Sequence, residues 1–510
     1  MILMITLLVL QSFPEVHPYN ILMIAPIDSL SHTRMFEELA KALAVKGHQV
    51  DLLSHFPLEN LNMEGISHIN LGSSNMFLNS FSVKLLGRSF IDIVDKMLFK
   101  PGHQQCLLLY NNPQFEKLKN ATKKYDLFIT EFFTSECVLP WAWHFNIPSV
   151  LVSTSLPLPW NNERFGVPDN PSYVPNYYGD FGAEMTLFQR AQNVWQYAVA
   201  RYKFWRSMNQ ADQVARAFFG PQMPPLEEVA YNSSLLLSNT HFSIHDARPL
   251  PPNVIEIGGL HINPPKPLSK HLDKLLDGNP QGTIYFSIGS MFAAETFPDE
   301  TLQGILDAFA QLPYDVIWRV NVANLSKNLN FSKNVHLESW VPQLDLLCDP
   351  RVKLFFSHGG IMGMQESIYC GVPILNFPII ADQRHNSRHA ELMGFGLVLE
   401  DISTASILDA CGTLLNDSKY AGNAKKASRE FLDRPLSAAD TATFWIEYVI
   451  RNQGAPKMQS YAKRLRWYQY YMLDLLVLVV TSLWALLYLL VLGVRFVLNR
   501  RRNQKKIKQN

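Results

Sequence analysis

Cysteine is scarce in this 510-residue chain, which contains only Cys106, Cys137, Cys348, Cys370 and Cys411. An odd, sparse set does not build the disulfide scaffold of a small secreted protein. No two of them are separated by only two residues, so the Cys-x-x-Cys ligand pairs of zinc sites and thioredoxin-like chemistry are missing. We therefore expect neither a disulfide scaffold nor a zinc site.

Charged residues are also few, at 17% of the chain, and 45 basic side chains are balanced by 44 acidic ones. The formal net charge of +1 argues against a protein that coats nucleic acid. Hydrophobic residues make up 47% of the sequence, which excludes a disordered or fibrous chain. A chain of this length is expected to form two or more domains.

The net charge is an average over three unlike segments. Residues 1–18 carry one acid, Glu15, and no lysine or arginine. Residues 471–510 carry seven basic residues and one acid, Asp474, which gives +6. The residues between them hold 38 basic and 42 acidic side chains, so a mildly acidic body of −4 is joined to a basic tail.

Both ends of the chain carry apolar runs. The first run, which ends at Phe13, is too short to span a bilayer and has the length of a signal-peptide core, although it lacks the usual positive start. A buried first strand is the alternative, but residues 19–27 fill that role better. The uncharged run 475–494 would form about 30 Å of helix, which matches a bilayer core. We expect a single span over residues 470–494, with a buried globular helix as the alternative.

The basic residues after this span favour a cytosolic tail and a body in the secretory lumen. Lys506 and Lys508 resemble a dilysine-type retrieval signal of the endoplasmic reticulum, with a basic membrane-surface tail as the alternative. Asn-x-Ser/Thr triplets that fit a luminal glycoprotein begin at Asn120, Asn232, Asn324, Asn330 and Asn416. The sequence therefore predicts a single-pass type I protein of the endoplasmic reticulum membrane.

Strand-like and helix-like segments alternate through the first half of the chain. Residues 19–25, 34–46 and 49–54 form a strand, helix and strand pattern, and further strands are expected at 126–130 and 149–153. A helical segment is expected at 137–145. Such β-α-β repeats imply a mainly parallel sheet with helices on both faces.

The second half repeats this pattern after six prolines between residues 249 and 267, which favour a linker. Strands are expected at 282–288, 315–319, 353–357 and 373–377, with a helix at 300–310. The sequence thus predicts an α/β protein with two facing, doubly wound Rossmann-like domains. Ligands of such domains bind at the carboxyl ends of the strands.

These patterns divide the chain into seven segments. They are a signal peptide (1–18), an N-terminal domain (19–255), a linker (256–281), a C-terminal domain (282–436), helices that return to the first domain and the membrane (437–469), a transmembrane helix (470–494) and a basic tail (495–510). Residues 155–205 are rich in aromatics, which occupy 12 of the 51 positions. We expect much of this aromatic region to be helical core, with some rings left to line an apolar pocket or face the membrane.

The segment most informative about chemistry is 355–383, in which a strand runs through Ser357-His358-Gly359-Gly360 into a helix. Glycines let the backbone approach a ligand closely, and a helix start presents free N–H groups at the positive end of its dipole. This pattern predicts a phosphate site in which His358 donates to a phosphate oxygen. Glu366, further along the helix, can accept both hydroxyls of a ribose, and Asp382-Gln383 can hold a sugar.

A glycine-rich turn alone is a weak signal, and the fingerprints G-x-G-x-x-G and G-x-x-x-x-G-K-[ST] are both missing. The whole spacing is more specific. It resembles the signature of the UDP-glycosyltransferases, F-[LIVMF]-[TS]-H-x-G, an acid, P-x-x-x-x-P and [DE]-Q. The chain fits this signature at Ser357, His358, Gly360, Glu366, Pro373, Pro378, Asp382 and Gln383.

The resemblance covers nearly the whole chain, including Phe286-Ser-Ile-Gly-Ser290, Trp340-Val-Pro-Gln343, Asp433-Arg-Pro435 and Trp445. The overall plan is similar to that of the animal membrane-bound members. The resemblance implies a GT-B fold, with an acceptor-binding N-terminal domain and a UDP-sugar-binding C-terminal domain. We therefore expect a UDP-sugar and a small lipophilic acceptor as the partners.

The resemblance also implies a role for each donor-site residue. Trp340 would stack on the uracil, Gln343 and Glu366 would bind the ribose, Ser290, His358 and Gly360 would hold the diphosphate, and Asp382 and Gln383 would hold the sugar, assisted by Asn386. The alternatives are a core position for Trp340, a solvated loop position for Gln343 and a helix cap for Ser290. Met362 departs from the family pattern, since many members have Asn there.

For the reacting groups, the resemblance implies that His32, directly after the first strand and before the helix, is the catalytic base. Histidine titrates near neutral pH, which suits a general base, although a lone histidine there is more often a cap or a surface residue. A carboxylate should orient it. Glu131 stands where the family has Asp and is our choice, with Glu136 and Asp126 as competitors.

No Asp-x-Asp pair occurs in the sequence, so we expect no metal, and no cofactor besides the UDP-sugar as co-substrate. The helix dipole and His358 would stabilise the departing UDP. The predicted reaction is an inverting transfer of a sugar to a hydroxyl of a small lipophilic acceptor, for conjugation or detoxification. Residues 54–57 and 440–448 resemble invertebrate members, which favours glucose over glucuronic acid or galactose.

Three other functions fit parts of the sequence less well. A non-catalytic UDP-sugar-binding scaffold is supported only by Glu131 and Met362, where the chain departs from the family. An NAD-type oxidoreductase is disfavoured by the missing fingerprint. A channel or transporter is disfavoured because only one span is expected. No nucleic acid partner is expected, and the acceptor and the oligomeric state, whether homo- or hetero-oligomer, stay open.

Overall fold

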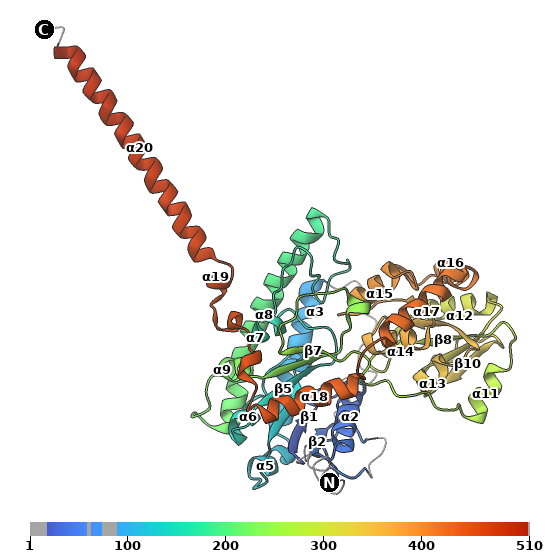
Figure 1. Cartoon of the computed structure of the whole chain (residues 1–510). Helices are drawn as coiled ribbons and strands as arrows, with labels where there is room; N and C mark the ends of the chain where they lie inside the picture. Colours follow the sequence, from blue (N-terminus) through green and yellow to red (C-terminus); the bar gives the residue numbers. More distant parts are fainter. Residues whose placement is uncertain (1–17, 59–62, 74–88, 508–510) are drawn as a thin grey trace, which may run out of the picture. The chain divides into compact units, whose positions relative to one another are not determined.

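The computed structural model describes residues 18–58, 63–73 and 89–507. Nearly all of the expected signal peptide, 1–18, lies outside these residues, and so does Lys508 of the expected retrieval signal. The chain divides into two units, Met1–Gln459 and Ser460–Asn510, which are treated separately below. Figure 1 shows the elements of both.

A seven-stranded parallel sheet forms the centre of the first domain, in the order β3-β2-β1-β4-β5-β6-β7. Its strands are β1 (Asn20–Ile24), β2 (Gln49–Ser54), β3 (Ile66–Asn70), β4 (Leu127–Glu131), β5 (Ser149–Ser153), β6 (Leu235–Ser238) and β7 (Val254–Glu256). The central strands β4 and β5 are buried along their whole length, as expected for a sheet covered on both faces. The strand order reverses between β1 and β4, where a doubly wound sheet places its ligand site.

The second domain repeats this order in a six-stranded parallel sheet, β10-β9-β8-β11-β12-β13. Its strands are β8 (Thr283–Ser287), β9 (Asp315–Arg319), β10 (Val335–Glu338), β11 (Val352–Ser357), β12 (Ile374–Asn376) and β13 (Gly396–Val398). Its reversal lies between β8 and β11. The prediction of an α/β protein with two Rossmann-like domains is therefore confirmed.

Helices cover both sheets. In the first domain they are α2 (Leu30–Val45), α3 (Phe90–Met97), the π-helix η2 (Leu98–Gln104), α4 (Gln105–Tyr110), α5 (Pro113–Lys119), α6 (Pro140–Phe145), α7 (Asn161–Phe165), α8 (Leu187–Phe219), α9 (Leu226–Tyr231) and α10 (Phe242–His245). The start of α8 is fixed by a capping box between Thr186 and Gln189. Two expected boundaries shift. Helix α2 begins at Leu30, so His32 lies in its first turn rather than before it, and α6 begins only at Pro140, which suits a first helical position.

The second domain and the segment that follows it carry the remaining helices of this unit. They are α11 (Lys270–Leu276), η3 (Ala294–Thr296), α12 (Asp299–Gln311), η4 (Val322–Asn324), α13 (Gln343–Leu347), α14 (Ile361–Cys370), α15 (Gln383–Leu392), α16 (Thr404–Asn416), α17 (Ser418–Leu432), α18 (Ala438–Arg451) and η5 (Pro456–Met458). Residues 257–269 between the sheets form neither helix nor strand, whereas α11, which falls in the expected linker, buries Leu272 and Leu276 in the core of the second domain.

Helix α18 follows the second domain in sequence but belongs to the core of the first. Its residues Ala442, Ile446 and Val449 are buried in the apolar cluster that α2 and β1 form. A polar contact supports this packing, because Nε2 of His48 lies 3.1 Å from Oε1 of Glu447. Figure 1 shows α18 next to α2. The chain therefore crosses from the second domain back to the first.

Four of the five cysteines form two disulfides. Cys106 in α4 is bonded to Cys137, which precedes α6. Cys348, directly after α13, is bonded to Cys370, the last residue of α14. Cys411 is free and buried. Two bridges beside large apolar cores reinforce the fold but do not make a disulfide scaffold of the kind the sequence excluded.

The second unit contains η6 (Tyr461–Arg464), α19 (Trp467–Tyr470) and the long helix α20 (Leu473–Ile507). Residues Leu473–Gln504 of α20 are long and apolar enough to cross a membrane, with a mean hydropathy of 2.7 in the most apolar part. None of that part is buried in the structure, which favours a membrane span over the alternative of a buried globular helix. The helix is a candidate membrane anchor.

Candidate functional site

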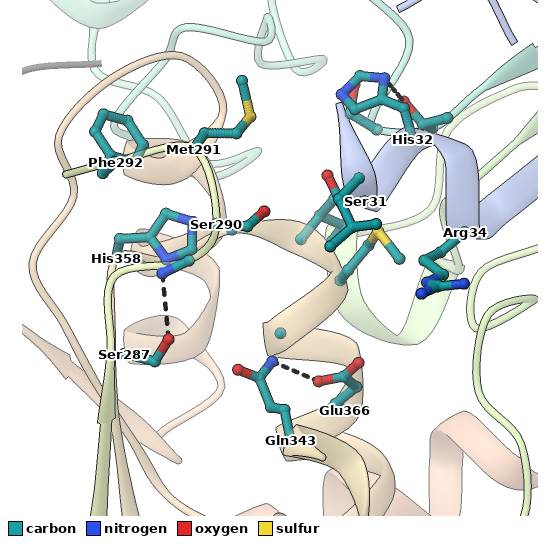
Figure 2. A pocket seen from close by; sticks show the side chains of 18 of the residues that line it. Ser31, His32, Arg34, Ser287, Ser290, Met291, Phe292, Gln343, His358 and Glu366 are labelled. Carbon is teal, nitrogen blue, oxygen red and sulfur yellow. Dashed lines mark hydrogen bonds between the residues drawn. The ribbon is translucent and has the colours of Figure 1, made fainter. Parts of the chain in front are cut away.

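A cavity of about 490 Å³ lies between the two domains of the first unit, at the carboxyl ends of both sheets. Figure 2 shows His32 and Arg34 of α2 on one side, and Gln343, His358 and Glu366 of the second domain on the other. Nine of the eleven residues predicted for the site line this cavity: His32, Ser290, Trp340, Gln343, His358, Gly360, Glu366, Asp382 and Gln383. The fold thus collects residues that are up to 351 positions apart in the sequence.

The side of the cavity formed by the first domain carries a histidine–carboxylate pair. Nδ1 of His32 lies 2.6 Å from Oε1 of Glu131, the last residue of β4. The Thr154 hydroxyl, directly after β5, donates to the same oxygen at 2.5 Å and lies 3.1 Å from Nδ1 of His32. The carboxylate is buried, with 2% of Glu131 exposed. It therefore orients the ring with Nδ1 as the protonated nitrogen, since a carboxylate accepts hydrogen bonds.

The two competitors for the partner acid have other contacts. Oε1 of Glu136 accepts a bond from Nε of the buried Arg164 at 2.9 Å. Oδ2 of Asp126 accepts from the backbone N–H of Asn20 at 2.8 Å. Of the three acids considered from the sequence, the structure therefore places only Glu131 against His32.

The other nitrogen of the His32 ring, Nε2, makes no hydrogen bond to the described residues. The ring packs edge-on against Phe133 at 5.1 Å between centroids, and both residues line the cavity. A neutral imidazole held by a carboxylate at Nδ1 keeps its lone pair on Nε2. This geometry can accept a proton from a hydroxyl group in the cavity.

The opposite side of the cavity carries the helix start predicted for phosphate. Gly360 precedes the first residue of α14 as its N-cap. A Cβ atom on Gly360 would lie 2.6 Å from Nε2 of His358, and one on Gly289 would lie 2.7 Å from Cε1 of the same ring. Only glycine leaves room for the histidine at these two positions. The free N–H groups of this helix start and His358 point to one anion site.

His358 is neutral in this setting. Burial lowers its pKa to about 4, with a smaller effect from the charge of Arg319. Its Nδ1 has no hydrogen-bond partner among the residues that the structure describes. A neutral histidine carries one N–H, so His358 can donate one hydrogen bond to a phosphate oxygen.

Gln343 and Glu366 both line the cavity and point toward one another, as Figure 2 shows. Nε2 of Gln343, the first residue of α13, donates to Oε2 of Glu366 at 2.5 Å, and its Oε1 accepts from the Tyr285 hydroxyl at 3.2 Å. These contacts contradict the alternative of a solvated loop for Gln343. Burial raises the pKa of Glu366 to about 7, and the charge of Asp345 adds to this effect.

Trp340 and Arg319 also line the cavity and lie side by side. Trp340 is 56% exposed, so the alternative of a core position is wrong. The Arg319 guanidinium lies 5.6 Å from the centre of its ring, and Nη1 of Arg319 donates to the carbonyl of Gly289 at 2.6 Å. An open, flat indole in a cavity can take a planar ring by stacking.

Asp382 and Gln383 lie at the start of α15, and their neighbours leave part of each side chain available. Oε1 of Gln383 accepts from the backbone N–H groups of Ile379 and Ile380, which leaves its amide N–H groups for a ligand. Oδ2 of Asp382 accepts from Nδ2 of Asn386 at 3.0 Å. Burial raises the pKa of Asp382 to about 6.

Asn386 stands apart from the predicted set, because it does not line the cavity. Its Nδ2 also donates to the carbonyl of Gly359 at 3.0 Å, and its Oδ1 lies 3.3 Å from Nε2 of His245. It therefore ties the carboxylate of Asp382 to the glycine turn and to the first domain. Its contacts are those of a supporting residue.

Two further predicted details can be placed. Ser290 lines the cavity but caps no helix, because the N-caps of η3 and α12 are Ala293 and Pro298, so that alternative is wrong. Met362, where many family members have Asn, also lines the cavity and packs against both domains. Its side chain offers an anion no donor, so backbone N–H groups must supply that contact.

The first domain also lines the cavity with apolar side chains, on the same side as His32. Ile27, Leu30, Met97, Phe133 and Tyr177 line it. Tyr177 comes from the aromatic region 155–205, whereas Trp160 and Phe204 of the same region are buried in the core with stacked rings, and Trp205 is exposed. The region therefore serves mostly as core, as predicted, and contributes one ring to the cavity.

Sequence reasoning missed Thr154, Tyr285 and Arg319. Thr154 directly follows β5, and Arg319 is the last residue of β9, so both lie at carboxyl ends of parallel strands. Polar residues at such ends are the signal that could have identified them. Among the described residues, no group of three or more His, Cys, Asp or Glu side chains is arranged to hold a metal ion.

Comparison with solved structures supports the same architecture. A UDP-glucosyltransferase from Polygonum tinctorium superposes with a TM-score of 0.57, covering 86% of this chain and all of that one at 15% identity. A glycosyltransferase of kitacinnamycin superposes with a TM-score of 0.56 at 18% identity, covering 85% of this chain and 99% of the other. At such low identity these likenesses show the fold alone, which is that of GT-B glycosyltransferases.

Sequence comparison adds the family. The UDP-glucoronosyl and UDP-glucosyl transferase family matches residues 24–508, and the chain belongs to this family. UDP-glucosyltransferase 2 of Dactylopius coccus is 34% identical over 473 residues, which cover 91% of this chain and 90% of that protein. UDP-glucuronosyltransferase 1A7 of Mus musculus is 31% identical over 392 residues, covering 76% and 72%. The protein is thus a glycosyltransferase, and the alternatives of an oxidoreductase and a non-catalytic scaffold are wrong.

Proposed function

We propose that this enzyme transfers glucose from UDP-glucose to a hydroxyl group of a small lipophilic acceptor, with inversion at the anomeric carbon. The observation that carries the proposal is the cavity itself, in which the His32–Glu131 pair faces the helix start at Gly360 and the carboxylate of Glu366. A base for the acceptor and an anion site for the leaving group therefore lie on opposite sides of one space.

The residues of the second domain hold the donor in this proposal. Trp340 stacks on the uracil, Gln343 and Glu366 bind the ribose, and Ser290, His358 and the N–H groups after Gly360 bind the diphosphate. Asp382 and Gln383 hold the hydroxyls of the sugar. Asn386 fixes the carboxylate of Asp382 by donating a hydrogen bond to its Oδ2. No metal or cofactor is assigned to the reaction.

The chemical step is one displacement. Nε2 of His32 takes the proton of the acceptor hydroxyl while its oxygen forms a bond to the anomeric carbon. The bond between that carbon and the β-phosphate oxygen breaks, and the electron pair leaves with UDP. Glu131 stabilises the imidazolium, and His358 with the α14 dipole stabilises the new phosphate charge. An α-linked donor gives a β-glycoside.

The surroundings of Asp382 favour a neutral sugar. A glucuronic acid carboxylate beside this buried acid would be repelled unless a cation lay between them. Of the two arginines that line the cavity among the described residues, Arg319 lies beside Trp340 and donates to the carbonyl of Gly289, and Arg34 is paired with Glu37. This arrangement supports glucose over glucuronic acid, and the apolar wall beside His32 supports a lipophilic acceptor such as a xenobiotic or endogenous phenol.

We also propose that the body lies in the lumen of the endoplasmic reticulum, anchored by α20 with its basic end in the cytosol. Two disulfides suit an oxidising compartment. The asparagines of all five glycosylation triplets are exposed: Asn120, Asn232, Asn324, Asn330 and Asn416. The basic residues that follow the apolar part of α20 suit the cytosolic side.

The test is an assay of the full-length enzyme in membranes, with a panel of phenols and alcohols. UDP-glucose, UDP-galactose and UDP-glucuronic acid are compared in parallel, and the product is analysed for a β-linkage. We expect turnover with UDP-glucose and loss of transfer in His32→Ala, with UDP binding retained. Full activity of His32→Ala would overturn the assignment of the base, and a preference for UDP-glucuronic acid would overturn that of the sugar.

A further inference from the structure

A buried histidine outside the predicted site faces the carboxylate of Glu366. His261 lies in the segment between the two sheets, and only 4% of its side chain is exposed. Its Nε2 lies 3.6 Å from Oε1 of Glu366. By ordinary distance and angle limits neither ring nitrogen has a hydrogen-bond partner among the described residues. A weak contact with the backbone of Met362, on the first turn of α14, slightly raises the pKa of this ring.

A buried polar ring with such loose contacts costs stability, which makes a role in the ligand-bound enzyme worth seeking. The gap to Glu366 is only slightly longer than a hydrogen bond. A shift of a few tenths of an ångström, when a ligand fills the cavity, would close it.

The segment that carries His261 is fixed to the same helix as Glu366. The backbone N–H of Gly259 donates to Oε1 of Gln365 at 3.1 Å. Nε2 of Gln365 in turn donates to the carbonyl of Asn239 in the first domain at 3.1 Å. Nη1 of Arg434 holds the carbonyl of Gly258 at 2.8 Å from the other side. His261 therefore keeps its position relative to α14.

The two oxygens of Glu366 face different neighbours. Oε2 accepts from Nε2 of Gln343, whereas Oε1 faces His261. A carboxylate that accepts bonds from both hydroxyls of a ribose must be ionised and must keep both oxygens directed at the sugar. A hydrogen bond donated to Oε1 would hold the carboxylate in that orientation and favour its ionised form.

We propose that His261 is a positioning residue for the donor nucleotide, and that its Nε2–H holds the Glu366 carboxylate in the orientation that receives the ribose. The inference rests on the proposed function, because that function makes Glu366 the ribose ligand. His261 itself touches Glu366 and not the substrate.

The charge state of the ring agrees with this role. Burial lowers the pKa of His261 to about 4, so at neutral pH the ring carries one N–H, which it can donate. The other titratable groups beside Glu366 are Asp345 of α13, whose charge raises the pKa of Glu366, and Tyr285 of β8, whose own pKa the charge of Glu366 raises. His261 is the donor among these neighbours that faces Oε1.

The experiment measures UDP binding to the full-length protein by calorimetry. His261→Phe keeps a ring but removes the donor, and His261→Gln places an amide N–H near the position of Nε2. His271→Phe is the matched control, because His271 is exposed and paired with Glu338. We expect the Kd for UDP to rise about tenfold in His261→Phe, by the loss of a bond to a charged group, and to change little in the Gln variant and the control.

Two readouts separate positioning from a structural role. In His261→Phe, UDP affinity should begin to fall at a higher pH than in the unaltered enzyme, because Glu366 then takes up a proton more readily. In a Glu366→Gln background, His261→Phe should have no further effect on UDP binding, since the carboxylate that it positions is gone. Equal effects of His261→Phe in both backgrounds, or none in either, would overturn the proposal.

A second pair of variants covers the case in which His261→Phe does not fold. The amide of His261→Asn is too short to reach the place of Nε2, so it should lose UDP affinity while His261→Gln keeps it. Equal affinities of the two would also overturn the inference. If the unaltered enzyme binds no UDP, the proposed function fails together with it. If UDP binds and its Kd does not depend on residue 261, only the inference fails.

Discussion

The hydroxyl of Thr154 donates to Oε1 of Glu131 at 2.5 Å, and this is the same oxygen that holds His32. The three residues come from neighbouring parts of the first sheet: the helix after β1, the end of β4 and the turn after β5. Glu131 stands where the family has the shorter Asp. A longer carboxylate has one more rotatable bond, and Thr154 restricts it. The hydroxyl therefore helps to orient His32, the base in the proposed function.

Replacing Thr154 by Val should lower kcat about tenfold, because the carboxylate loses a charge-assisted hydrogen bond and with it a fixed orientation. Thr154→Ser keeps the hydroxyl and should retain most of the activity. The measurement is steady-state kinetics with saturating donor, and UDP affinity serves as the control for intact folding. An unchanged kcat in Thr154→Val would show that Glu131 needs no help in holding His32.

Trp340 offers a second test, on the donor side. Trp340→Ala should raise the KM for the UDP-sugar about fivefold to a hundredfold, because stacking on a base contributes roughly 1–3 kcal/mol. The KM of Trp340→Phe should lie between those of the unaltered enzyme and of Trp340→Ala. The indole is 56% exposed, so the melting temperature should hardly move. A large loss of thermal stability with an unchanged KM would instead make Trp340 a structural residue.

The Cys348–Cys370 bridge joins α13 to α14, which carry Gln343 and Glu366. Replacing both cysteines by Ser should lower stability by about 2–4 kcal/mol, as the loss of a native bridge typically does. UDP affinity should fall as well, because the two helices that hold the ribose in the proposed function lose a link.

The matched control for this prediction is the double Ser variant of the other bridge, Cys106–Cys137, which lies in the first domain. It should lower the melting temperature without changing UDP affinity in the folded protein. If both double variants weaken UDP binding equally, the effect belongs to general destabilisation. Thermal melts and calorimetry of the three proteins separate these outcomes.

Three buried histidines meet where α10 of the first domain packs against α15 of the second. The ring of His389 lies 4.5 Å from that of His385 and 5.8 Å from that of His245. Burial lowers the pKa of His389 to about 4, Asp246 raises it and Arg248 lowers it. In the unfolded chain the pKa of His389 is near 6.5. As the pH falls, His389 therefore binds a proton in the unfolded chain before it does so in the folded protein.

The stability that neutral His389 contributes is present above about pH 6.5 and is lost as the pH falls toward 4. His389→Gln, which cannot titrate, should lose less stability than the unaltered enzyme over this range. The measurement is the melting temperature from pH 7.5 to 4.5, compared with His271→Gln, in which an exposed histidine is replaced. Parallel curves for all three proteins would contradict the prediction.

Much of the fold follows from local sequence pattern. Buried parallel strands are continuous apolar runs, and those of β1, β2, β5 and β9 were located to within a residue or two. Helix ends were less accurate. The first turn of α2 contains Ser31, His32 and Thr33, which lack the apolar pattern of a helix, so its start was placed too late.

The site was predictable in the second domain, where five of its residues lie in the one stretch 355–383 and match its signature spacing. The contacts of the first domain depend on strands far apart in the sequence. The choice of Glu131 over Glu136 is decided by Arg164, 28 residues beyond Glu136, which neutralises that competitor. The contact of His261 with Glu366 arises only when the two domains meet, and no local pattern announces it.

The place of α18 has a consequence for how the protein is made. Ala442, Ile446 and Val449 complete the core of the first domain, although they follow the whole second domain in the chain. During synthesis, the first domain must therefore wait with an open apolar face until residue 451 has left the ribosome. A nascent chain in that state exposes the kind of apolar surface that chaperones bind. Cutting the chain within residues 257–269 and separating the two halves would expose the same apolar face of the first domain, because α18 would leave with the second half.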